Sequence, residues 1–173
     1  EGVGYFDVNQ RKGVRWNATK AFLRPIQHRP NLQVWTGAQV SRLVTARDER
    51  GLRVTGVETQ PRGKDGQLSG EPLIARLREG GEVVMAAGAV GTPQILQLSG
   101  IGPGALLQQH GITPVLAQAQ VGANLQDHLA MSYYYKATEP TLNNVLGSLW
   151  GKLRVGLQQL MAGSRNFALQ TIS

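Results

Sequence analysis

The sequence contains no cysteine among its 173 residues. This absence excludes a disulfide framework, a thiolate nucleophile and a metal cluster built on cysteine. Aromatic residues make up only 6% of the chain. No run of apolar residues reaches the roughly 18 that a membrane-spanning helix needs. The sequence therefore predicts a folded domain without thiol chemistry, and we predict no metal site in it.

Charge of one sign is not concentrated anywhere in the sequence. Lys and Arg number 18 against 11 Asp and Glu, which gives a net charge of +7. A basic balance indicates nucleic acid or an anionic membrane when the charges cluster, but no run of five or more like charges exists here. Hydrophobic content of 41% and charged content of 17% are typical of a globular protein. We therefore predict no nucleic-acid partner.

The stretch 82–102 carries the most information. Its first part, residues 82–87, is a short apolar run, which favours a strand inside a parallel sheet. Ala87, Gly88 and Ala89 then present almost no side chain. The backbone at this turn is therefore able to lie against a flat or charged ligand.

A helix is predicted after this turn, with a signal at each end. Thr92 is a suitable N-cap and Pro93 a suitable first helical residue. Ile95, Leu96 and Leu98 give the helix an apolar face. Gly100 ends the helix where a left-handed residue usually lies. The stretch as a whole predicts a strand, a small-residue turn and a helix.

This stretch resembles the second signature of the glucose–methanol–choline (GMC) oxidoreductases. That signature is a small pair, two free positions, Ser/Thr-Pro, a short helix, then Ser-Gly-aliphatic-Gly. The matching positions here are Gly88-Ala89, Thr92-Pro93, Ile95-Leu96 and Ser99-Gly100-Ile101-Gly102. The alternative is an ordinary strand–turn–helix of any α/β protein. The flanking stretches 13–44 and 102–129 also resemble the family, and the resemblance becomes thinner after residue 130.

The resemblance implies a mixed α/β fold. Residues 1–129 are expected to form part of a Rossmann-like FAD-binding domain with a β-meander insertion, and residues 130–173 the start of a substrate-binding domain.

Because the first residue is Glu and the opening resembles the middle of family sequences, we expect an internal fragment of a longer enzyme rather than a natural short protein. The expected strands are 32–36, 40–45, 53–59, 73–77, 82–87, 115–117 and 131–136. Besides the helix that follows Thr92, the expected helices are 18–23, 104–110 and 141–161.

The resemblance also implies the cofactor FAD and hydride transfer from a small primary alcohol to the flavin. It implies that the backbone of Val40 meets the adenine and that Ala86, Ala87 and Gly88 lie near the dinucleotide. The alternatives are a plain core valine and tight helix–strand packing. The main Gly-x-Gly-x-x-Gly fingerprint of dinucleotide binding does not occur in the sequence. The glycines at 100, 102 and 104 follow a helix rather than a strand, so they are rejected as a phosphate cradle.

No catalytic residue is predicted in this chain. The family's histidine base and its His or Asn partner lie near the family's C-terminus, in a region that has no counterpart here. His28, His110 and His128 are each given a structural role: an exposed loop, a helix end and an ordered loop. Asn124 and Asp127 are predicted to order that loop by accepting hydrogen bonds from backbone N–H groups.

Two further alternatives stay open from the sequence. The first concerns the class of protein. The resemblance favours part of a dehydrogenase of the alcohol or choline type, and the alternatives are a GMC-family oxidase, a hydroxynitrile lyase or a non-catalytic small binding module. The helix predicted at 141–161 has a wide apolar stripe, which favours core packing over a membrane surface. The electron acceptor and the compartment are not encoded in any motif of the sequence.

Overall fold

The structure is a computed structural model that describes residues 4, 7–11 and 14–162. The chain divides into two units. One comprises residues 35–129, and the other comprises residues 1–34 and 130–173. The expectations that fall on residues 163–173, and on the side chains of Leu142, Leu160 and Met161, lie outside what is described.

An antiparallel sheet of three strands forms the base of the 35–129 unit. The strands are β3 (Ala38–Asp48), β4 (Gly51–Pro61) and β5 (Leu73–Arg76), in that spatial order. The predicted strands at 40–45, 53–59 and 73–77 are confirmed as parts of these elements. A tight turn joins β3 to β4, where Gly51 takes a φ of +107°. The Gly/Pro-rich stretch 61–71 links β4 to β5 as predicted.

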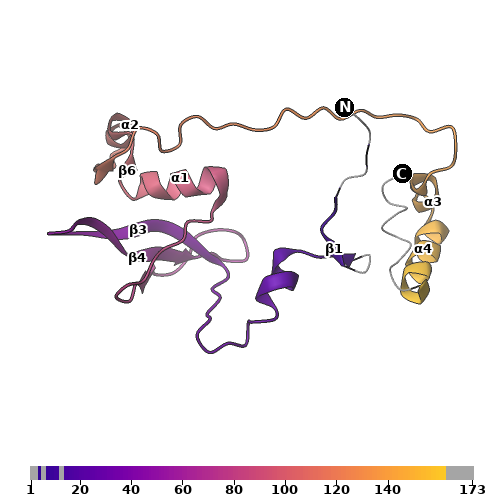
Figure 1. The fold of residues 1–173 in the computed structure, drawn as a ribbon, viewed down its shortest axis with the longest axis horizontal. Coiled ribbons are helices and arrows are strands. Elements are labelled where there is room, and N and C mark those ends of the chain that lie inside the picture. Colours follow the sequence, from indigo (N-terminus) through magenta and orange to yellow (C-terminus); the bar gives the residue numbers. More distant parts are fainter. Residues whose placement is uncertain (1–3, 5–6, 12–13, 163–173) are drawn as a thin grey trace. The chain divides into compact units, whose positions relative to one another are not determined.

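Helix α1 (Gly88–Leu98) lies above the hairpin of β3 and β4 (Figure 1). After it come β6 (Ile101–Gly102), α2 (Gly104–Gln109) and β7 (Leu116–Ala117), and β6 pairs with β7 in parallel. The helix predicted at 104–110 and the strand predicted at 115–117 are thus confirmed. Three hydrophobic side chains are buried in the described part of the chain, namely Leu43, Ile95 and Leu107. Leu43 and Ile95 come from β3 and α1, so burial of apolar area holds the helix on the sheet.

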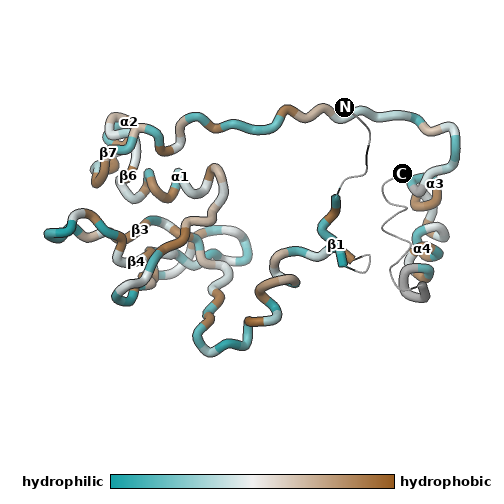
Figure 2. Tube along the Cα trace, viewed as in Figure 1, coloured by the Kyte–Doolittle hydropathy of each residue, from teal (hydrophilic) through white to brown (hydrophobic). Residues whose placement is uncertain are grey.

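The strand predicted at 82–87 is not formed, and neither is the one predicted at 32–36. A strand needs a neighbour to bond its backbone groups, and within the described residues neither segment has one. Val84 is 84% exposed. The hydrophobic residues 83–85 can be followed in Figure 2 on the segment that leads into α1. The prediction of a strand inside a parallel sheet at 82–87 is therefore wrong.

The predicted start of α1 is also wrong. The helix begins at Gly88 rather than after Thr92, and Pro93 lies inside it. A proline inside a helix removes one backbone hydrogen bond and crowds the carbonyl four residues before it, yet the helix continues through Pro93 here. Thr92 still serves the helix start, because its Oγ1 accepts the N–H of Ala87 at 3.2 Å. The predicted end is confirmed, since Gly100 follows the last turn with a φ of +79°.

The N-terminal segment contains short elements. Strands β1 (Gln10–Arg11) and β2 (Val14–Arg15) pair in an antiparallel hairpin. The helix predicted at 18–23 is present as a single π-helical turn, η1 (Thr19–Leu23). In this turn the N–H of Arg24 bonds the carbonyl of Thr19 at 2.9 Å. Pro25 then follows, as predicted for the end of a helix.

The C-terminal segment differs from the prediction in two ways. No strand forms at 131–136, where the chain has no partner among the described residues. The helix predicted at 141–161 is divided into α3 (Leu142–Leu146) and α4 (Leu149–Ala162). The division has a local cause, because the hydroxyl of Ser148 accepts the N–H of Gly151 at 3.0 Å and caps a new helix. Thr141 and Asn144 form a capping box at the start of α3.

Candidate cofactor site

The turn at Ala86, Ala87 and Gly88 leads directly into α1 and is exposed throughout. Gly88 takes a φ of +83°, and a Cβ built on it meets no atom within 4 Å. The backbone conformation, rather than a lack of room, therefore favours glycine here. No acidic residue lies in the first turn of α1. The turn consequently offers accessible backbone, minimal side chains and the positive end of a helix dipole.

Val40 lies in β3, opposite Thr59 of β4, and is half-buried. The register shifts between Val40 and Arg42, so a β-bulge follows Val40 directly. Within the described chain β3 pairs with β4 alone, so its other side is a sheet edge. The carbonyl of Val40 accepts a long hydrogen bond of 3.4 Å from Nε2 of Gln39. Val40 is thus a residue of an edge strand within the described chain.

A hydroxyl connects the strand of Val40 to the helix of the turn. Ser99, at the end of α1, accepts the N–H of Leu43 at 2.8 Å and donates to the carbonyl of Ile95 at 2.5 Å. Its side chain is buried, with 8% of the residue exposed. The sequence reasoning gave Ser99 no role beyond its match to the family signature, because its partner Leu43 is distant in sequence.

A cleft of about 480 Å³ opens between α1 and the loop at 122–126. Ala89 and Pro93 line it from the helix, and Asn124 lines it from the loop, where its φ is +56°. The loop is held to the helix by Gln97, whose Nε2 donates to the carbonyl of Val121 at 3.0 Å. The start of α1 therefore borders a concave surface.

The predicted ordering of the loop is confirmed for Asp127 and wrong for Asn124. The carboxylate of Asp127 accepts the backbone N–H of His128 at 2.8 Å. The side-chain oxygen of Asn124 instead accepts from Nε2 of Gln126 at 3.4 Å. His128 is exposed.

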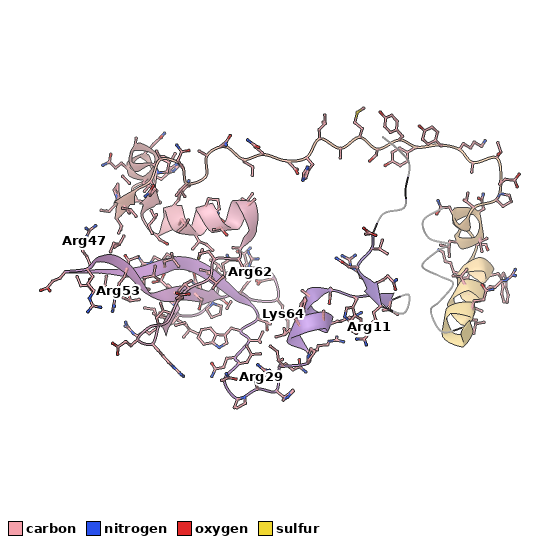
Figure 3. All side chains as sticks on the ribbon, in the orientation of Figure 1. Arg11, Arg29, Arg47, Arg53, Arg62 and Lys64 are labelled. Carbon is pink, nitrogen blue, oxygen red and sulfur yellow. The ribbon has the colours of Figure 1, made fainter. Side chains whose placement is uncertain are left out.

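Charged groups of the 35–129 unit are spread out rather than gathered at the turn. Figure 3 shows Arg47 and Arg53 at one end of the β3–β4 hairpin, with Arg62 and Lys64 toward the other. Arg42 bonds Glu58 at 2.9 Å, and this hydrogen bond and charge raise the pKa of Arg42.

Two classes of feature are absent from the part of the chain that the structure describes. It holds no group of three or more His, Cys, Asp or Glu residues arranged to bind a metal ion. None of its helices has both the length and the apolar character to cross a membrane.

The small-residue turn, the helix that follows it and the edge strand beside that helix all lie in the 35–129 unit. A sequence model of GMC oxidoreductases matches residues 1–130. The chain belongs to this family, which confirms the resemblance drawn from residues 82–102.

Three relatives illustrate the similarity. A chloroplastic fatty acid photodecarboxylase of Chlamydomonas reinhardtii is 43% identical over 75% of this chain and 20% of its own length. An alcohol dehydrogenase (acceptor) of Pseudomonas putida is 33% identical over 100% of this chain and 29% of its own length. The mitochondrial choline dehydrogenase of Mus musculus is 37% identical over 92% of this chain and 25% of its own length. The chain thus spans less than a third of each of these relatives.

Proposed function

We propose that these residues are part of an FAD-dependent oxidoreductase that acts on CH–OH groups. The observation that supports this most is the exposed, uncharged turn at Ala86, Ala87 and Gly88, in a chain that belongs to the GMC family. Residues 1–129 would form part of the FAD-binding domain, and residues 130–173 would open a substrate-binding domain. The relatives named as alcohol and choline dehydrogenases support a small alcohol as substrate.

The residues present fit FAD by the chemistry of their donors. The first turn of α1 carries no carboxylate that would repel a diphosphate. The side chains of Ala86 and Ala87 end at Cβ, so the backbone is accessible to a bulky group. The edge position of Val40 leaves a backbone strip for the edge of an adenine ring. FAD, when bound, supplies the acceptor for the hydride of the alcohol carbon.

The role of this chain is binding and orientation rather than proton transfer. In this proposal Val40 holds the adenine end and the turn at Ala86–Gly88 lies along the dinucleotide. The histidine base that takes the hydroxyl proton belongs to another part of the enzyme. We accordingly expect the 173-residue chain alone to bind FAD weakly and to show no bleaching of the flavin absorption by alcohols.

The test uses the parent enzyme and two matched glycine variants. Gly88 and Gly111 both take a left-handed φ, of +83° and +70°, and both have open space around a new Cβ. Gly88→Val and Gly111→Val therefore introduce the same backbone strain, but only the first places a side chain at the proposed FAD contact. We expect Gly88→Val to lower FAD affinity by about tenfold more than Gly111→Val.

The same preparation separates the possible reactions. Anaerobic bleaching of the flavin by a primary alcohol supports the proposed reaction, and oxygen consumption against dye reduction separates an oxidase from a dehydrogenase. Light-dependent loss of carbon dioxide from a fatty acid, without alcohol-driven bleaching, would instead place the enzyme with the photodecarboxylase. A parent enzyme without bound flavin, or equal FAD affinity in the two glycine variants, would refute the proposed cofactor site.

A further inference from the structure

The Ser99 hydroxyl both accepts and donates a hydrogen bond, and both partners are backbone groups. Its Oγ accepts from the N–H of Leu43 and donates to the carbonyl of Ile95. Leu43 and Ile95 are themselves 5% and 7% exposed. A buried backbone N–H that loses its acceptor carries the full penalty of its desolvation. The serine hydroxyl is therefore the group that allows the edge of β3 to be buried at this point.

The bond between Ser99 and Leu43 is the only hydrogen bond that joins α1 to β3, two elements described over their whole length. Around it the interface is incomplete, because a cleft of about 510 Å³ is lined by Leu43, Thr45, Leu98 and Ser99. An open cleft leaves fewer apolar contacts to set the position of the helix along the strand. A directional bond at this place consequently fixes how far α1 slides along β3.

The two proposed FAD contacts lie on the two elements that this bond joins. Val40 is in β3, three positions before Leu43, and the turn of Ala86, Ala87 and Gly88 opens α1. The structure assigns Ser99 the role of a positioning residue, which fixes the spacing between the adenine contact at Val40 and the dinucleotide contact at the turn. This inference rests on the proposed function, and in it Ser99 acts through its bond to Leu43 rather than by contact with FAD.

The test compares a ligand that spans both contacts with one that reaches a single contact. FAD spans Val40 and the turn, whereas adenosine reaches only Val40. In the deflavinated parent enzyme we expect Ser99→Ala to weaken FAD binding about tenfold and to leave adenosine binding unchanged. The matched control is Thr55→Val, which removes a hydroxyl that bonds the carbonyl of Val44 within the β3–β4 hairpin. It should change neither affinity.

The outcomes separate positioning from general loss of structure. If Ser99→Ala weakens FAD binding and adenosine binding equally, or changes neither, the positioning role is overturned. The proposed function would still stand in that case, provided that the wild-type parent enzyme binds FAD. A wild-type parent enzyme that binds neither ligand would overturn both. If Ser99→Ala does not fold, Ser99→Cys retains the side-chain size with a weaker hydrogen-bonding group, and the same selective weakening of FAD is expected from it.

Discussion

Replacement of Gly100 by Ala tests how tightly the chain turns after α1. A Cβ at this position would lie 2.7 Å from the carbonyl oxygen of Thr113 and 2.7 Å from Cγ2 of Val115. The φ of +79° adds about 1–2 kcal/mol of strain for a residue with a side chain. Overpacking against backbone adds about 1–3 kcal/mol. We therefore expect Gly100→Ala to destabilise this part of the fold by about 3 kcal/mol.

Gly111→Ala provides the control, because Gly111 also follows a helix, with a φ of +70°, but has no atom within 4 Å of a new Cβ. Gly111→Ala should therefore destabilise the fold only through the strain of the left-handed backbone, by about 1 kcal/mol. The assay is hydrogen exchange at the amides of Val115 and Leu116, which both bond the carbonyl of Gly100. A difference of about 2 kcal/mol makes exchange in Gly100→Ala about 30-fold faster than in Gly111→Ala. Equal exchange in the two variants would refute the steric reasoning.

Two more predictions concern the packing and the charges. Leu107 is 1% exposed, so Leu107→Ala should lower the free energy of unfolding by about 3 kcal/mol. Leu106 is 39% exposed, so Leu106→Ala should lower it by less than about 1 kcal/mol. Urea titration of both variants measures the two losses, and equal losses would contradict the assigned core. Glu58→Gln breaks the ion pair with Arg42, whose side chain is 59% exposed, so stability should fall by less than about 0.5 kcal/mol. A larger loss that persists in high salt would show that the pair is more than a screened surface contact.

The meander was predictable from the sequence because its signals are local. The Val- and Thr-rich segments at 40–45 and 53–59, and the Gly/Pro-rich stretch at 61–71, indicate strand, strand and loop without reference to distant parts of the chain. In the structure β3 and β4 are longer, at 11 residues each. The two strands of a hairpin continue to pair up to the turn that joins them. The residues of β3 and β4 near that turn are mostly polar, so no hydrophobic pattern in the sequence indicates that the strands extend there.

Other features depend on groups far away in the chain. The strand expected at 82–87 needs a pairing partner, and an apolar run reveals nothing about whether one is present. The bond of Ser99 joins it to Leu43 across 56 positions, a pairing that no local pattern encodes. The division of the 141–161 helix was accessible in principle, because Ser148 three positions before Gly151 is an N-cap spacing. The apolar stripe runs through residues 141–161 without a break, and it therefore favoured one continuous helix.

Gln97 has a consequence for how relatives of this chain diverge. Its side chain reaches from α1 to the carbonyl of Val121, and on the way it fills the space where Gly102 and Gly122 would carry a Cβ, at 3.0 Å and 2.7 Å. Substitutions at positions 97, 102 and 122 are therefore expected to depend on one another. A relative with a short residue in place of Gln97 is free to accept alanine at the position of Gly102, and it must hold the 122–126 loop by another group.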